Sequence, residues 1–169
     1  MRLFCWNKVI NFYTQILCVI EITIYTGFTI QLTTHMTIIE VSNQKELNDA
    51  LKSRSQPFIT IVGEWDEVRI PKEATVGNIE INGTIEGSIE NQGTVERDIR
   101  VTIFATVNGN IENWGAVEGD IKNLGAVEGN IFNNGTVKGD IKNQGTVEGN
   151  IHVGDGGTVE GSIKNESHK

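Results

Sequence analysis

Residues 115–144 have the sequence GAVEGDIKNL-GAVEGNIFNN-GTVKGDIKNQ, which is three copies of a ten-residue unit. The unit is Gly-(Ala/Thr)-Val-x-Gly-(Asp/Asn)-Ile-x-Asn-x, and an aliphatic residue also occupies its valine position in the other copies. Its isoleucine recurs at Ile79, Ile89, Ile99, Ile111, Ile121, Ile131, Ile141, Ile151 and Ile163. Repetition this regular predicts a solenoid, in which each unit stacks on its neighbours.

Apolar and charged residues alternate within one unit. The inward face is predicted to hold Val117, Gly119, Ile121 and Asn123, and the outward face Glu118, Asp120 and Lys122. We expect the central glycine to let facing strands approach closely, because it has no side chain. We also expect Asn-x-Gly to form a corner in which the glycine takes a positive φ.

Two folds satisfy this unit. In an antiparallel meander, Asn-x-Gly would be a hairpin loop, but the sheet would leave a wide apolar face that one short helix cannot cover. In a parallel β-solenoid, or β-helix, equivalent residues stack on each other and the apolar faces become buried. We therefore predict an all-β solenoid. The alternation of Asp120, Asn130, Asp140 and Asn150 indicates two units per coil, and so about four and a half coils.

Residues 36–73 are predicted to form a β-α-β module that caps the solenoid. The expected order is a strand over 37–41, a helix over 44–53, and strands over 57–63 and 67–70. Asn43 is a good N-cap, and Glu46 three residues later completes a capping box. A solenoid end needs such a cover because it exposes apolar side chains and unpaired strand edges. The solenoid itself is then expected over 74–165, followed by a polar tail over 166–169.

Residues 1–35 form an atypical hydrophobic leader. Glu21 lies in the middle of the segment, which disfavours a membrane span. Three interpretations stay open: translation starts at Met36, the segment is a weak signal or membrane anchor, or it is an integral strand or helix of the fold. Cys5 and Cys18 are the only cysteines, so no disulfide or thiolate framework is predicted for the repeat.

The net charge of the chain is −8, and the repeat carries most of the excess of Asp and Glu, so its surface is acidic. An acidic surface repels phosphate, so we expect no nucleic-acid partner. A membrane partner is expected only if residues 1–35 are an anchor. The cytoplasm is slightly favoured as the compartment, with the cell surface or secretion as the alternative.

Residues 145–153 (GTVEGNIHV) and 157–163 (GTVEGSI) resemble bactofilins over roughly 83–165. Bactofilins are bacterial polymer-forming cytoskeletal proteins with a right-handed parallel β-helix, so the resemblance implies a role in assembly. The ten-residue period differs from the shorter spacing of bactofilin strands. The helix over 44–53 is also expected to block the end-to-end stacking that bactofilins use. The capping module is similar to the opening of parallel β-helix proteins such as pectate lyases.

No catalytic constellation is visible in the sequence. It contains no Gly-x-Ser-x-Gly, no His-Glu-x-x-His and no phosphate loop. His35, His152 and His168 have no partner at metal-ligand spacing. We therefore predict that the protein is not an enzyme and has no catalytic residue, metal site or cofactor.

Two corners, 101–106 and 153–158, each contain two extra residues, and deviations in a repeat often mark binding loops. The candidate binding residues are therefore Phe104 and Asp155 in these corners, together with Trp114, which is expected at an outward turn. Ile151, Val159 and Ile163 are expected to form an assembly edge at the C-terminal coil.

Three functions follow from these features. The first is a structural, self-assembling solenoid that forms a homo-oligomer through its C-terminal coil. The alternative is a surface adhesin or a phage-fibre-like module that binds a glycan or a protein. The third is a polysaccharide-active enzyme built on a β-helix.

Overall fold

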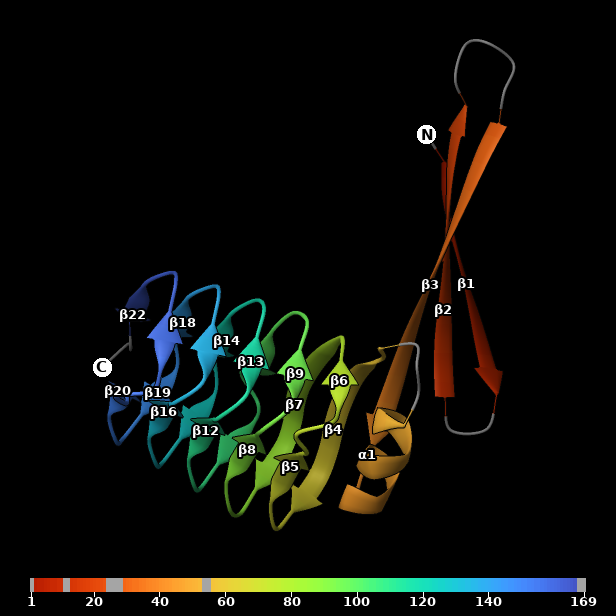
Figure 1. Cartoon of the computed structure of the whole chain (residues 1–169). Helices are drawn as coiled ribbons and strands as arrows, with labels where there is room; N and C mark the ends of the chain where they lie inside the picture. Colours follow the sequence, from red (N-terminus) through yellow and green to blue (C-terminus); the bar gives the residue numbers. More distant parts are fainter. Residues whose placement is uncertain (1, 11–12, 24–28, 53–55, 167–169) are drawn as a thin grey trace.

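The computed structural model describes residues 2–10, 13–23, 29–52 and 56–166, with side chains described from residue 38 onward within these ranges. It confirms the parallel β-solenoid, because coils stack along one axis from β4 to β22 in about six turns (Figure 1). The antiparallel meander is therefore wrong for the repeat. Among the described residues, no helix is both long and apolar enough to span a bilayer.

The described part of the leader is made of strands. They are β1 (Arg2–Ile10), β2 (Tyr13–Thr23) and β3 (Thr29–Val41), and they pair antiparallel in chain order. The last part of β3, from Ile38 to Val41, also pairs in parallel with β4 (Phe58–Trp65) on its other side. The strand expected over 37–41 is therefore the end of a longer strand that joins the solenoid.

The predicted helix is present as α1 (Gln44–Leu51). The Asn43 side chain accepts the N–H of Glu46 at 3.0 Å, as expected of an N-cap. The Glu46 carboxylate accepts the N–H of Ser42 at 2.9 Å, one residue before the N-cap whose N–H a capping box would use. Leu47 and Ala50 are buried in the same core as the coils.

The first two coils contain three strands each. They are β4, β5 (Val68–Ile70) and β6 (Thr75–Val76), then β7 (Asn78–Ile85), β8 (Ile89–Asn91) and β9 (Thr94–Val95). Strand β4 pairs with β7 over its whole length, and β5 and β6 pair with β8 and β9. Stacking therefore begins at β4, inside the segment predicted to be only a cap, and earlier than the expected boundary at residue 74.

The later coils contain four short strands each. The third is β10 (Ile99–Val101), β11 (Thr106–Val107), β12 (Ile111–Asn113) and β13 (Ala116–Val117), and the fourth is β14 (Ile121–Asn123), β15 (Ala126–Val127), β16 (Ile131–Asn133) and β17 (Thr136–Val137). The fifth is β18 (Ile141–Asn143), β19 (Thr146–Val147), β20 (Ile151–Val153) and β21 (Thr158–Val159), and β22 (Ile163–Asn165) begins a sixth.

The coil contains two units, as predicted. Ile111 pairs with Ile131, twenty residues later, and Ile99 pairs with Ile121 across the coil that contains an inserted corner. Equivalent strands collect into three sheets. The first follows β1-β2-β3-β4-β7-β10-β14-β18-β22, with the column β11-β15-β19 branching from β7. The second follows β5-β8-β12-β16-β20 and the third β6-β9-β13-β17-β21. We call the second of these sheets the B sheet.

The predicted inward face is confirmed, because the side chains of Val117, Ile121 and Asn123 are fully buried. The unit is not one continuous strand, however. Val117 ends β13 and Ile121 begins β14, and these strands belong to different sheets. The chain bends at the glycine between them, so each unit has two corners.

The repeat glycines serve a purpose other than the one expected. Among the described glycines only Gly63 has a positive φ, so the Asn-x-Gly corners do not need one. A Cβ at Gly135 would overlap the carbonyl oxygen of Gly115, and one at Gly119 would overlap the Asp98 carboxylate and lie 2.7 Å from the Arg97 carbonyl oxygen. These glycines therefore allow successive coils, rather than facing strands, to approach closely.

The N-terminal end of the solenoid is covered. Strand β4 has β3 beside it, and α1 packs Leu47 and Ala50 against the core. The Gln44 side chain pairs with the free edge of β5: its amide donates to the Arg69 carbonyl at 3.1 Å, and its carbonyl accepts the Arg69 N–H at 3.1 Å. One side chain thus takes the place of a neighbouring strand at this edge.

Candidate functional site

Two ladders of buried asparagines hold the short corners. The side-chain amide of each asparagine donates to the side-chain oxygen of the asparagine in the next coil. Asn113 donates to Asn133 at 2.8 Å in one ladder, and Asn123 donates to Asn143 at 2.9 Å in the other. The Asn123 amide also donates to the Thr146 carbonyl at 2.8 Å, and its oxygen accepts the N–H of the corner residue Gly125. Because these polar groups are buried and satisfied, the ladders are structural.

The two longer corners have valine in place of asparagine for a physical reason. Each closes its own backbone turn, by the Ala105 N–H donating to the Thr102 carbonyl at 3.0 Å and the Gly157 N–H donating to the Gly154 carbonyl at 2.9 Å. No corner asparagine is needed to bind the backbone there, so an apolar residue fills the core position.

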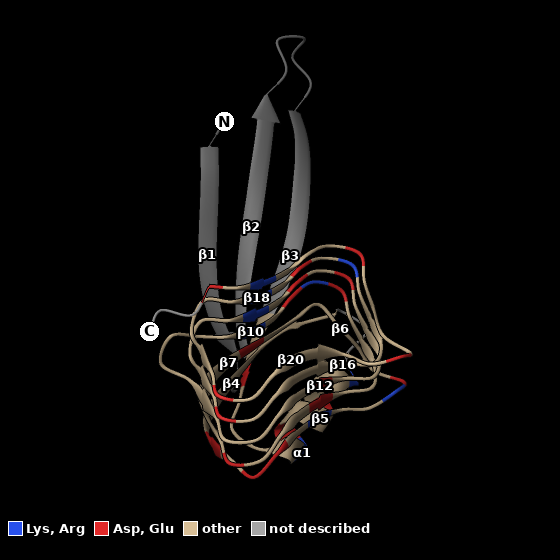
Figure 2. Cartoon of the chain, turned by 90° about the vertical axis from the view of Figure 1, so that its left-hand side faces the viewer, with Lys and Arg blue, Asp and Glu red and all other residues tan. Residues whose placement is uncertain are grey.

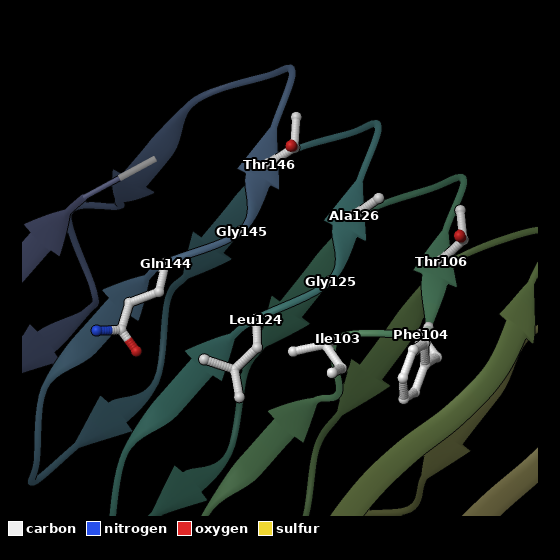
Figure 3. A pocket seen from close by; sticks show the side chains of 10 residues that line it. Ile103, Phe104, Thr106, Leu124, Gly125, Ala126, Gln144, Gly145 and Thr146 are labelled. Carbon is white, nitrogen blue, oxygen red and sulfur yellow. The ribbon is translucent and has the colours of Figure 1, made fainter. Parts of the chain in front are cut away.

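The first longer corner places large apolar side chains in solvent. Ile103 and Phe104 are 63% and 84% exposed. They border a shallow groove with Leu124 and Gln144, which occupy the equivalent corners of the next two coils (Figure 3). Small, uncharged side chains, including those of Thr106 and Ala126, form the floor of this groove. Phe104 therefore lies on the surface as expected of a binding residue.

Trp114 and Asp155 lie at the other side of the coil. Both occupy corners between the B sheet and the third sheet, two coils apart, with the Asn134 corner between them. The structure therefore brings Trp114 and Asp155 to one column of corners and does not bring Phe104 to it. Asp155 is exposed and has no ion pair among the described residues.

Trp114 is part of a larger groove over the B sheet, of about 620 Å³, which we call the Trp114 groove. Its lining residues are Asn110, Glu112, Trp114, Asn130, Phe132, Asn150, Ile151 and His152. The Trp114 and Phe132 ring centroids are 5.6 Å apart, as are those of Phe132 and His152. The ten-residue unit by itself does not predict that these rings meet. Aligning the chain on a twenty-residue period would have placed Phe132 and His152 in one column.

A column of alternating charges follows the first sheet. The Lys122 ammonium lies 2.8 Å from the Asp98 carboxylate and 3.1 Å from that of Asp120. The pattern continues with Lys142, which contacts Asp120 and Asp140 at 3.0 Å each. The ribbon segments of Lys and Arg follow one another near β10 and β18 (Figure 2, blue). These acids are already paired, so the column is a structural feature.

Each acid in this column also binds the backbone of the next coil. The Asp140 carboxylate accepts the Ser162 N–H at 2.7 Å. This hydrogen bond, together with Lys142 and Lys164, holds the pKa of Asp140 well below its usual range. The asparagine column of the B sheet does the same with a neutral side chain, since Asn130 accepts the Asn150 N–H at 2.8 Å.

The depressed pKa of Asp140 predicts acid sensitivity. Its stabilising contribution is complete above the pKa of the unfolded chain, about 4, and is lost as pH falls toward the folded value. We expect Asp140→Asn to keep the backbone hydrogen bond but lose the lysine contacts. The urea midpoint of this variant should therefore fall less between pH 7 and pH 3 than that of the wild type. The control is Glu128→Gln, because Glu128 is exposed and makes no ion pair among the described residues. Equal acid sensitivity of both variants would contradict the assignment.

The C-terminal coil differs from all earlier coils in burial. Val137 and Ile141 are fully buried, whereas Ile151 and Val159 in the last coils are only half-buried and Ile163 is 48% exposed. Among the described residues, the strands β19 to β22 each have a neighbouring strand on one side only. The residues predicted to form an assembly edge therefore lie together at this end.

The described residues contain no group of three or more His, Cys, Asp or Glu side chains that could hold a metal ion. In the charged column, lysines lie between successive aspartates.

Comparison with known proteins finds no matching family model, no matching curated protein and no matching solved structure.

Proposed function

We propose that this protein is a structural, non-enzymatic solenoid that assembles by docking its C-terminal coil on a second copy of the chain. The observation that supports this proposal is the exposed edge at Ile163. The column to which Ile163 belongs is fully buried at Ile141 and Ile121, one and two coils earlier.

The hydrogen-bonding groups of the same end add a second argument. Asn143 donates its amide to Asn165 at 2.8 Å, so the buried ladder continues to the last described strand. Within the described part of the chain, strands β19 to β22 present one edge without a neighbouring strand, and such edges promote pairing with another chain. A second copy of the chain can cover the exposed apolar side chains of this end and can pair with its free strand edges.

The cover on the N-terminal end restricts how two copies of the chain can associate. Helix α1 and the Gln44 side chain occupy the edge that a head-to-tail stack would need. Like ends should therefore meet, which gives a closed two-fold dimer rather than a filament. The resemblance of 83–165 to bactofilins supports a role in assembly, and the cap is the feature that separates a dimer from their polymers.

Sedimentation across protein concentration tests this proposal, with Ile163→Lys as the informative variant. Docking would bury the new ammonium without a partner, so we expect dimer affinity to fall about a hundredfold or more while the fold is retained. The matched control is Ile103→Lys, because Ile103 is also an exposed isoleucine but lies on a corner away from the end. A wild type that stays monomeric at high concentration, or an Ile163→Lys dimer as tight as the wild type, would contradict the proposal.

A further inference from the structure

The Trp114 groove has a different chemistry from the equivalent surface of the first sheet. In the first sheet the outward strand positions of the last three coils hold Lys122, Lys142 and Lys164, each paired with an aspartate. In the B sheet the corresponding column holds Glu112, Phe132 and His152. The groove contains no lysine or arginine and one carboxylate. Its surface is therefore aromatic and amide-rich rather than ionic.

Its aromatic side chains form a row along the solenoid axis. Trp114, Phe132 and His152 come from three successive coils, which are about 4.8 Å apart at ordinary strand spacing. The Phe132 and His152 rings are stacked at 18°, whereas the Trp114 ring is tilted by 58° to Phe132. The Trp114 residue is also 46% exposed, so much of its indole is available to a ligand.

Polar groups lie beside these rings. The Glu112 carboxylate accepts the Asn110 amide at 3.0 Å and the Trp114 indole N–H at 3.3 Å, which fixes the indole in place. At the other end of the groove, the side chains of Asn150 and His152 have no hydrogen-bond partner among the described residues. Their donors and acceptors therefore face the groove or solvent without an internal partner.

We propose that the Trp114 groove binds a neutral oligosaccharide chain. The C–H groups of a pyranose carry partial positive charge and are attracted to the negative face of an aromatic ring. Its hydroxyls both donate and accept, which matches the amide of Asn150, the imidazole of His152 and the carboxylate of Glu112. The Phe132 and His152 rings stack on each other, so the exposed indole of Trp114 provides the ring face that a sugar would contact.

Two alternative ligands fit the groove less well. Acidic sugars would be repelled by Glu112 and by the net charge of −8, with no basic side chain in the groove to compensate. A protein partner binds most tightly where its anchoring side chains enter well-packed pockets that exclude water. The Trp114 groove instead lies open over the outward face of the B sheet.

Isothermal titration calorimetry of the full chain tests the proposal. The probes are cellohexaose, xylohexaose and N-acetylchitohexaose as neutral chains, and hexagalacturonate as the acidic chain of equal length. We expect at least one neutral probe to bind and hexagalacturonate not to bind. Trp114→Ala should weaken binding about tenfold or more without changing the melting temperature, and Trp114→Phe should restore part of the affinity. Phe104→Ala is the control, because Phe104 is exposed on a different corner, and its binding should match the wild type.

Three outcomes would overturn the proposal: no neutral probe binds at millimolar concentration, Trp114→Ala binds like the wild type, or hexagalacturonate binds as tightly as the neutral chains. Loss of dimerisation in Trp114→Ala without any sugar binding would instead make the groove a protein interface. The Ile163→Lys variant keeps the two proposals separate. If assembly fails but the groove is a glycan site, this variant still binds the neutral probe.

Discussion

Replacing Ile131 with aspartate is expected to abolish cooperative folding of the solenoid. Ile131 is fully buried between Ile111 and Ile151 in a column of isoleucines. Loss of the isoleucine costs about 2–5 kcal/mol, and burial of a carboxylate without a partner adds several more. The sum is comparable with the whole stability of a typical domain. Circular dichroism should show no cooperative melting transition.

Two neighbouring variants make this test specific. Ile131→Val keeps an aliphatic side chain in the column and should cost only about 1 kcal/mol. Phe132→Asp changes the next residue, which faces outward and is half-buried, so its melting temperature should fall much less than that of Ile131→Asp. If Phe132→Asp and Ile131→Asp melted alike, the assignment of the two faces would be wrong.

Gly129→Val is expected to have an effect of similar size for a different reason. A Cβ at Gly129 would lie 2.5 Å from the Asn110 side-chain oxygen and 2.5 Å from the Gly109 carbonyl oxygen. Both atoms belong to the preceding coil, whose distance is fixed by the parallel strands on either side of the corner. The coils must separate locally, at a cost of about 3 kcal/mol or more. Strand propensity alone predicts the opposite, because valine forms strands better than glycine.

The chain offers a matched control for this prediction. Arg97 occupies the position that glycine holds in the other units, and its guanidinium lies 5.2 Å from the centre of the Phe58 ring. This corner already accommodates a Cβ, so Arg97→Val should lose only the cation–π contact, about 1 kcal/mol. We expect the urea midpoint to fall sharply for Gly129→Val and slightly for Arg97→Val. Equal midpoints would show that coil spacing does not exclude side chains at the repeat glycines.

Local patterns determined a large part of this fold. The ten-residue period fixes which residues face the core, because a solenoid must bury one apolar column in every coil. Val117, Ile121 and Asn123 are therefore buried as predicted. Helix α1 was also predictable, since Asn43 and the spacing of Leu47 and Ala50 are local signals. The alternation of Asp and Asn at Asp120, Asn130 and Asp140 was sufficient to predict two units per coil.

Other features depend on contacts between coils and were not predictable from the unit. The role of the glycines was mistaken, because Gly119 meets residues 97 and 98, about twenty positions earlier in the sequence. The start of the solenoid was placed too late, because β4 and β5 lack the repeat motif and are recognised only by their pairing with β7 and β8.

The sequence by itself thus determined the inward columns, the coil length and the cap, since each depends on a local period or a local capping signal. Only the tertiary structure decided which outward side chains meet. Trp114 and Phe132 are 18 residues apart, and Phe132 and His152 are 20 apart. They approach because β12, β16 and β20 pair in parallel in a fixed register. A two-residue insertion at 101–106 or 153–158 changes the sequence spacing without changing the pairing. The outward neighbours of a side chain are therefore a property of the stacked coils, and the ten-residue unit alone does not contain them.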